Sequence, residues 1–131
     1  MIKKLSKDFI AYDGDSFTIE WYYDSRDCSQ AKDYYNKLSK VQRDKLMQLF
    51  RLLGDTGKIF NKEKFRNESD QIYAFKPQPD RFLCFFYIGS KIIVTNAFEK
   101  KQDKLPAGEK TKALKSRSDY VKRVLGKDYY D

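Results

Sequence analysis

Four cationic side chains stand where the apolar runs in the second half of the chain begin or end. Lys76 ends one run, Arg81 begins the next, and Lys100 and Lys101 follow a third. Consecutive strands of a meander run in opposite directions, so these positions come to the same end of a sheet. Such a cluster could hold a polyanion, with arginine gripping a phosphate through two hydrogen bonds. The lysines could instead only protect a sheet edge from pairing, and both interpretations stay open.

The absence of histidine limits the chemistry that this cluster could perform. No histidine occurs in the sequence, which excludes serine–histidine and cysteine–histidine pairs and a histidine general base. The two cysteines, Cys28 and Cys84, cannot form a four-thiolate metal site, and no glycine-rich phosphate loop is present. We therefore expect no metal and no cofactor, and any reaction would depend on Lys, Arg, Tyr or a carboxylate.

The positive charge is concentrated in the second half of the chain. The whole sequence carries a formal charge of +8. Residues 57–131 hold 17 Lys and Arg against 10 Asp and Glu, whereas residues 1–56 hold 10 against 9. A basic half of this kind indicates a polyanionic partner, most often nucleic acid. A lysine-rich surface that is merely solvated is the alternative.

Length and apolar content predict one cytoplasmic domain. A chain of 131 residues suits a single modest core. The longest apolar run, Phe82–Ile88, is far shorter than the roughly 18 residues that a membrane helix requires, so no membrane association is expected. The first residues contain lysines but no apolar secretory core, and the two cysteines make no disulfide framework.

The elements that would position the cationic cluster follow from the spacing of apolar residues. Ser16–Asp24 alternates apolar and polar side chains, which predicts a strand with one buried face. A short helix is expected over residues 27–40, and a second helix should begin at Ser39, where Gln42 completes a capping box. Gly54 is its expected stop. The apolar stripe of this second helix consists of Leu46, Leu49, Phe50 and Leu53.

The second half of the chain reads as three strands followed by a helix. Residues 71–76 form the first strand, and the two prolines after it prevent a regular ladder there. Arg81–Ile88 and Lys91–Phe98 make a hairpin, and Pro106 suits the first turn of a helix that ends near Gly126. The predicted fold is α+β with the order β-α-α-β-β-β-α. Residues 1–15 are interpreted as an N-terminal extension, residues 16–125 as the domain and residues 126–131 as a tail.

Residues 72–106 resemble the signature of the HigB-like, phage-derived toxin family within the RelE/ParE superfamily. They read IYAFKPQPDRFLCFFYIGSKIIVTNAFEKKQDKLP. Members of that family combine aromatic strands with basic residues at the strand ends, a phenylalanine followed by two lysines, and a proline that opens the last helix. Upstream, FTIEWYYD and KVQRDKLMQLFRLLGDTGKI are similar in kind to the family's first strand and second helix. The resemblance extends over residues 16–124.

The resemblance implies a RelE/ParE-like fold, with a twisted antiparallel sheet packed by an N-terminal helical hairpin. It implies the toxin of a type II toxin–antitoxin system: a ribosome-dependent, metal-independent mRNA endoribonuclease that inhibits translation. Its partners would be mRNA on the ribosome and a helix-turn-helix antitoxin protein. Two alternatives stay open because superfamily members differ in activity. One is a ParE-like, non-enzymatic inhibitor of DNA gyrase, and the other is a catalytically inactive phage-derived interaction domain.

The catalytic roles implied by the resemblance fall on three of the cations. Arg81 would hold the scissile phosphate, and Lys76 and Lys101 are the candidates for general base and general acid. A lysine among other cations has a lowered pKa, so part of it is neutral near pH 7 and can accept a proton. Lys100 would be an accessory phosphate contact. The flanking carboxylates of Asp80 and Glu99 would partly offset this charge, or one of them could act as the base instead.

Four further residues are candidates for RNA binding. Lys64 and Arg66 could extend the phosphate-binding track, with a solvated loop as the alternative. Tyr73 and Tyr87 could stack on nucleobases, because each has a ring face and a polar tip. Ordinary core packing is the alternative for both tyrosines.

Overall fold

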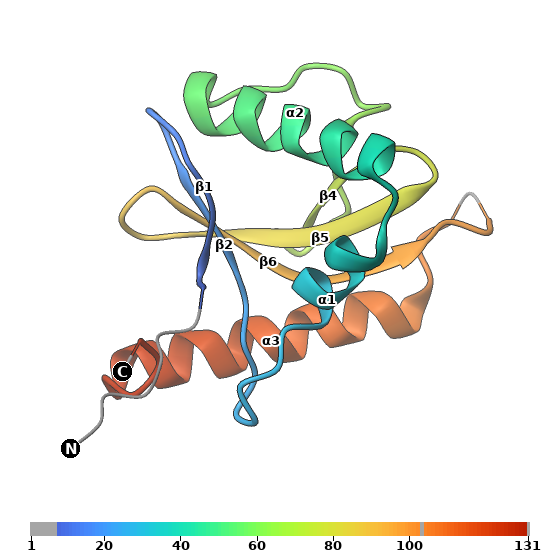
Figure 1. The fold of residues 1–131 in the computed structure, drawn as a ribbon. Helices are drawn as coiled ribbons and strands as arrows, with labels where there is room; N and C mark the ends of the chain where they lie inside the picture. The colour runs from blue at the N-terminus through green and yellow to red at the C-terminus, as the bar shows by residue number, and fades with distance from the viewer. Residues whose placement is uncertain (1–7, 103, 131) are drawn as a thin grey trace.

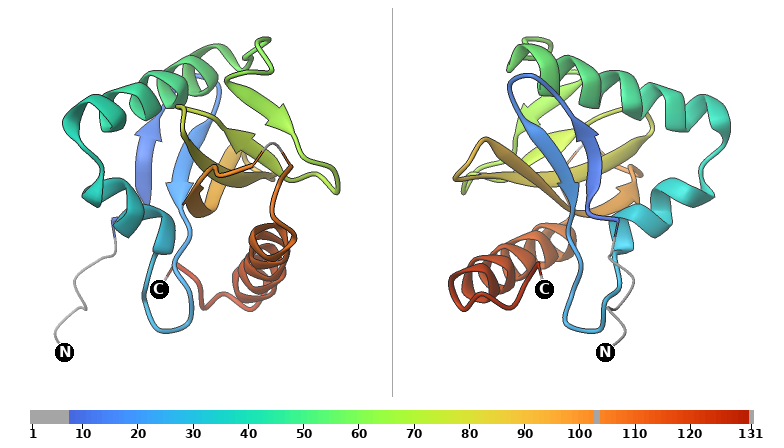
Figure 2. Two further views of the ribbon diagram at one scale, coloured as in Figure 1. Left: turned by 90° about the vertical axis from the view of Figure 1, so that its right-hand side faces the viewer. Right: turned by 60° about the vertical axis from the view of Figure 1, so that its left-hand side comes forward.

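A computed structural model describes residues 8–102 and 104–130 of the chain. Its elements form three layers, with α1 and α2 on one face of a six-stranded sheet and α3 on the other (Figure 1, Figure 2). In chain order they are β1 (Ile10–Asp13), β2 (Thr18–Trp21), α1 (Gln30–Lys37), α2 (Lys40–Thr56), β3 (Phe65–Asn67), β4 (Tyr73–Phe75), β5 (Asp80–Tyr87), β6 (Lys91–Glu99) and α3 (Ala107–Leu125). None of these helices combines the length and the apolar character that crossing a membrane would require.

The sheet is mixed, because one pair of neighbouring strands is parallel. The strand order is β1-β2-β6-β5-β4-β3, and every pair is antiparallel except β2 with β6. The α+β class and the β4-β5-β6 meander are confirmed, but the expectation of a fully antiparallel sheet is wrong. β2 reaches β6 only after the chain has passed through two helices and three strands, and a long connection of this kind allows parallel pairing. The sheet also contains β1 and β3, two strands of only four and three residues that the sequence patterns do not predict.

Both ends of the described chain take part in the fold. Residues 10–13, which lie inside the segment interpreted as an extension, form β1 and pair with β2. Residues 1–7 of that segment lie outside the described residues. In the C-terminal tail, the buried Tyr129 accepts a hydrogen bond of 2.9 Å at its hydroxyl from the N–H of Tyr23. Asp131 lies outside the described residues.

One core fills the space between the sheet and the helices α1 and α2. The predicted stripe of α2 is buried, and it packs against Trp21 of β2 and Phe82 of β5. The Ser39 side chain accepts a hydrogen bond of 3.2 Å from the N–H of Gln42, which confirms the predicted start of α2. The four stripe residues are Leu46, Leu49, Phe50 and Leu53.

The helix α2 extends beyond its predicted stop. It ends at Thr56, and Gly57, with a φ of 79°, adopts the left-handed conformation that caps it. Gly54 is instead a buried residue inside the helix, because the turn between β1 and β2 approaches it closely. A Cβ on Gly14 in that turn would lie 2.3 Å from the carbonyl carbon of Gly54. The absence of side chains at these two positions lets the first hairpin pack directly on α2.

The second core lies between the sheet and α3. Leu83 and Phe85 of β5 pack there against Tyr120 of α3, whereas the alternate residues of β5 face α2. Successive side chains of a strand point to opposite faces, so Arg81 belongs to the α3 face and its neighbour Asp80 to the α2 face. These adjacent residues of opposite charge therefore enter different surroundings.

Candidate nucleic-acid interface

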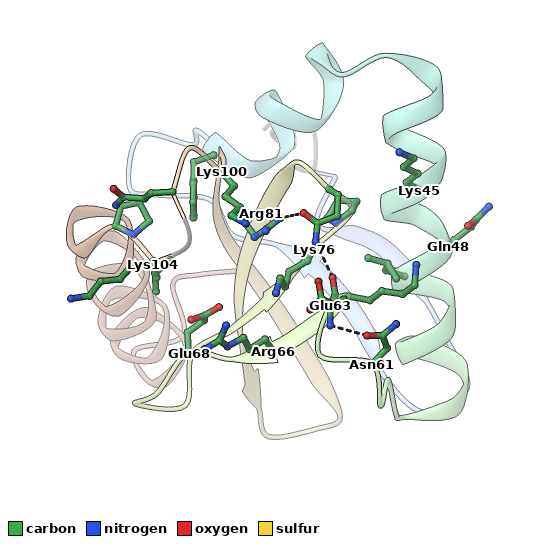
Figure 3. A pocket seen from close by; sticks show the side chains of 18 residues that line it. Lys45, Gln48, Asn61, Glu63, Arg66, Glu68, Lys76, Arg81, Lys100 and Lys104 are labelled. Atoms are coloured by element: carbon green, nitrogen blue, oxygen red, sulfur yellow. Dashed lines mark hydrogen bonds between the residues drawn. The ribbon is translucent and has the colours of Figure 1, made fainter.

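A groove at the rim of the sheet brings most of the predicted cations together. It has a volume of about 820 Å³ and lies between α2 and the loop before α3, beside the outer strands β3 and β4. Its described lining includes seven cations, Lys45, Lys64, Arg66, Lys76, Arg81, Lys100 and Lys104, and two carboxylates, Glu63 and Glu68. Figure 3 shows Lys45 on one side, Lys104 on the other, and Arg81 and Lys76 between them. Such an excess of positive charge suits an anionic ligand.

Arg81 is held in the groove by its own loop. It is 7% exposed, and Nη1 donates to the Gln78 side-chain oxygen and the Asp80 carbonyl at 3.0 Å and to the Pro79 carbonyl at 3.4 Å. Nε and Nη2 have no hydrogen-bond partner among the described residues, yet no buried side-chain nitrogen or oxygen there is unsatisfied. These N–H groups must therefore reach solvent. They form a side of the guanidinium that can bind a phosphate through two hydrogen bonds.

The same loop is fixed from the other face of the sheet by α1 and α2. The buried Asp80 carboxylate accepts hydrogen bonds from the Tyr34 hydroxyl at 2.6 Å and from the Gln42 side-chain amide at 2.8 Å. Gln42 also donates to the carbonyl of Gln78 at 3.0 Å. Burial and the bond to Asp80 raise the pKa of Tyr34, so its phenol keeps the proton that it donates. The nearest acidic neighbour of Arg81 in sequence is thus occupied elsewhere.

Lys76 is a buried cation beside Arg81 whose pKa is lowered. It is 9% exposed, and its ammonium donates to the Lys62 carbonyl at 3.1 Å. Burial lowers the pKa of Lys76 most, and the charge of Arg81 lowers it further, while Glu63 acts in the opposite direction. Neither cation forms an ion pair with a carboxylate of the described chain. More of Lys76 is therefore neutral near pH 7 than of an ordinary lysine, which favours a role as general base.

One wall of the groove is the β3–β4 hairpin, and α3 holds this hairpin in place. The three consecutive turn residues 69–71 all have positive φ. The Asp70 carboxylate pairs with Lys110 of α3 at 2.8 Å, and Arg117 of α3 donates to the Asp70 carbonyl at 2.6 Å. These contacts position β3, which carries Arg66 into the groove.

Five of the eight predicted site residues line the groove, namely Lys64, Arg66, Lys76, Arg81 and Lys100. Lys101 is exposed and lies outside the described lining. Tyr73 lines a neighbouring hollow and packs with the core on the α2 side of the sheet. Tyr87 lies at the far end of β5, where its ring meets that of Tyr120 edge-on at 5.0 Å. The cationic cluster is therefore gathered around Arg81, while three of the predicted residues lie apart from it.

The part of the chain that forms this groove matches a known protein family. The family described as Phage derived protein Gp49-like (DUF891) matches residues 33–118, which is more than half of the chain. The chain is a member of this family. Every groove-lining residue falls within the matched range, so the groove belongs to the Gp49-like unit. A comparison with curated proteins gives no match.

The Gp49-like groove also contains residues that the sequence patterns do not single out. Lys45 lies on the exposed side of α2, where a lysine has no distinguishing signal. Lys104 belongs to the polar segment before Pro106, and Gln78 separates two prolines in the loop that holds Arg81. Only the position of that loop opposite α2 and α3 could have identified these residues as part of one site.

The reactive groups of the Gp49-like chain are otherwise few. Among residues 8–102 and 104–130, no three His, Cys, Asp or Glu side chains gather as they would around a metal ion. Cys84 is buried in the sheet, and burial raises the pKa of its thiol, which makes it a poor nucleophile. The charged side chains that line the groove are its lysines and arginines together with Glu63 and Glu68.

Proposed function

We propose that this Gp49-like protein is a HigB-like toxin of the RelE/ParE superfamily, from a type II toxin–antitoxin system. It is a ribosome-dependent, metal-independent mRNA endoribonuclease that acts in the cytoplasm, and a helix-turn-helix antitoxin protein silences it. The observation that carries this proposal is the meeting of Arg81 and Lys76 in an open groove with a large excess of positive charge. Membership of a phage-derived family is compatible with a toxin.

The proposed reaction is attack of an RNA 2′-hydroxyl on the adjacent phosphodiester. The neutral amine of Lys76 takes the 2′-hydroxyl proton, the 2′-oxygen bonds to phosphorus, and the bond from phosphorus to the 5′-oxygen breaks. Nε and Nη2 of Arg81 stabilise the negative charge that collects on the phosphate oxygens. Lys100 protonates the leaving 5′-oxygen, because it lines the groove, whereas Lys101 does not. The products are a cyclic 2′,3′-phosphate and a 5′-hydroxyl.

The outer cations of the groove bind phosphates on either side of the cleaved bond. Lys45 lies on α2, and Lys104 lies before α3. Lys64 comes just before β3, and Arg66 lies on it. A strand of RNA that crosses the groove would therefore meet positive charge before and after Arg81. Contacts of this kind release counterions, so the affinity for RNA should fall as salt concentration rises.

Expression in a bacterial host, with Arg81→Lys as the variant, tests this proposal. The wild-type protein should arrest growth and cleave translated messages. Arg81→Lys keeps the charge but loses the planar fork, and it should cleave about 100-fold more slowly. Lys115→Gln is the matched control, because Lys115 is an exposed lysine of α3 outside the groove lining, and it should keep wild-type activity. Circular dichroism of the purified variants checks that each is folded.

The possible outcomes separate the three functions implied by the sequence. Cleavage that is unchanged in Arg81→Lys would remove Arg81 from the reaction. A DNA-damage response without loss of RNA would identify a gyrase inhibitor. Harmless expression of the folded wild-type protein would identify an inactive interaction domain.

A further inference from the structure

A second hollow lies next to the groove, beyond the C-terminal end of α2. It has a volume of about 660 Å³ and shares Glu63, Arg66 and Lys76 with the groove as a common wall. Besides two more lysines, Lys58 and Lys62, its lining contains apolar and aromatic side chains that the groove lacks: Phe60, Phe65, Tyr73 and Phe86, with Leu53 and Ile59. A basic groove and an aromatic hollow are thus adjacent and open on the same rim of the sheet.

The rings of the aromatic hollow form a floor with one exposed ring beside it. Phe65 and Tyr73 stack with ring centres 5.4 Å apart and 4° between their planes, and Phe86 meets Tyr73 edge-on at 5.1 Å. Phe60, in the connector after α2, is 86% exposed, and the ammonium of Lys58 lies 5.8 Å from its ring centre. Phe60 and Phe86, the latter 38% exposed, both line this hollow, so exposed apolar surface is gathered there, and a contiguous exposed apolar patch indicates a ligand-binding role.

We propose that the aromatic hollow binds an unpaired nucleobase of the same RNA strand whose phosphates occupy the groove. This inference rests on the proposed function. Arg66 and Lys76 stand in the wall between the two hollows, where the sugar and phosphate that link the bound base to the groove would pass. Phe60 supplies the free ring face on which the base stacks.

The proposed base site determines the class of substrate. A base that stacks on a protein ring must leave its own helical stack, so a base paired within a duplex cannot enter. The substrate is therefore a single strand. Every base has a flat π face, and a site built on stacking should accept all four bases with little preference. An acidic peptide with an apolar side chain would match the same charges, but the continuity with the groove and the stacked rings favour a base.

The test compares binding of a fluorescein-labelled 2′-O-methyl oligoribonucleotide, which cannot be cleaved, as a single strand and as a duplex. Phe60→Ala should raise the Kd for the single strand about tenfold and leave the Kd for the duplex unchanged. Phe60→Trp should restore tight binding, because tryptophan offers a larger stacking face. Ile88→Ala is the matched control, since Ile88 is an apolar residue that is 83% exposed and lies outside both linings, and it should change neither Kd.

Parallel measurements on Arg81→Lys separate a failure of the base site from a failure of the proposed function. If Arg81→Lys weakens binding but Phe60→Ala does not, the base site is refuted and the phosphate groove stands. If Arg81→Lys changes neither Kd and also leaves the cleavage of translated messages unchanged, the groove proposal fails and the base site with it. If Phe60→Ala weakens only the binding of a synthetic acidic, leucine-containing peptide, the hollow is a protein-docking surface and the inference is overturned.

Discussion

Replacing Tyr34 with phenylalanine should destabilise the protein by removing one anchor of the loop that presents Arg81. The change deletes only the hydroxyl that donates to the Asp80 carboxylate at 2.6 Å, and it keeps the ring that meets Phe82 edge-on at 5.6 Å. A hydrogen bond to a charged group contributes about 1.5–3 kcal/mol. Tyr34 is only half-buried, and Asp80 keeps its bond from Gln42, so we expect the lower end of that range, about 1.5 kcal/mol.

Urea unfolding followed by tryptophan fluorescence measures this loss. Trp21 is the single tryptophan and is 3% exposed, so its emission reports on the core between the sheet and α2. Tyr35→Phe is the matched control, because the Tyr35 hydroxyl has no hydrogen bond within the described chain, and its free energy of unfolding should stay within about 0.5 kcal/mol of wild type. Equal losses in Tyr34→Phe and Tyr35→Phe would refute the anchoring role of the hydroxyl.

Two further substitutions probe the groove and the packing behind it. The free energy of unfolding of Lys76→Met, relative to wild type, should fall as the pH rises from about 7 to about 10. Burial and the charge of Arg81 lower the pKa of Lys76 in the folded state, so the unfolded wild-type chain binds more protons than the folded one. Wild-type stability therefore rises through that pH window. A difference in the free energy of unfolding between Lys76→Met and wild type that stays constant with pH would contradict this prediction. Gly14→Ala should cost about 1–3 kcal/mol, because its Cβ would lie 2.3 Å from the carbonyl carbon of Gly54. Gly108→Ala, with no atom within 4 Å of the new Cβ, is its control, and equal melting temperatures for the two variants would show that the first hairpin can move away from α2.

The parts of the fold that could be predicted are those specified by local patterns. The stripe of α2 repeats with helical spacing, and Ser39 caps that helix as expected. β5 and β6 are long apolar runs joined by a short turn, so their antiparallel pairing follows from the chain itself. The parallel pairing of β2 with β6 joins segments far apart in sequence, and no local pattern encodes it. β1 and β3 are too short to show a clear alternation of apolar and polar side chains.

The limits of the predicted site have an equally physical origin. β5 has eight residues, and a strand of that length spans about 26 Å at roughly 3.3 Å per residue. Tyr87 ends the strand that Arg81 nearly begins, so the two residues cannot share a rim. Lys100 continues the ladder beyond β6, since its N–H donates to the Pro79 carbonyl at 2.9 Å, whereas Lys101 is exposed beyond that contact. The direction of a side chain just past a strand cannot be read from spacing alone.

The neighbours Asp80 and Arg81 explain why a basic site can form beside an acidic residue. In the sequence alone, an aspartate next to an arginine suggests a local ion pair that would neutralise the positive charge of the groove. The pleat of β5 instead sends the carboxylate to the α2 face, where Tyr34 and Gln42 occupy it, and sends the guanidinium to the α3 face. The acid thus stabilises the loop while Nε and Nη2 of Arg81 stay available to an anion. A substitution that turned the Asp80 carboxylate toward the groove would weaken anion binding even though the net charge of the chain stayed the same.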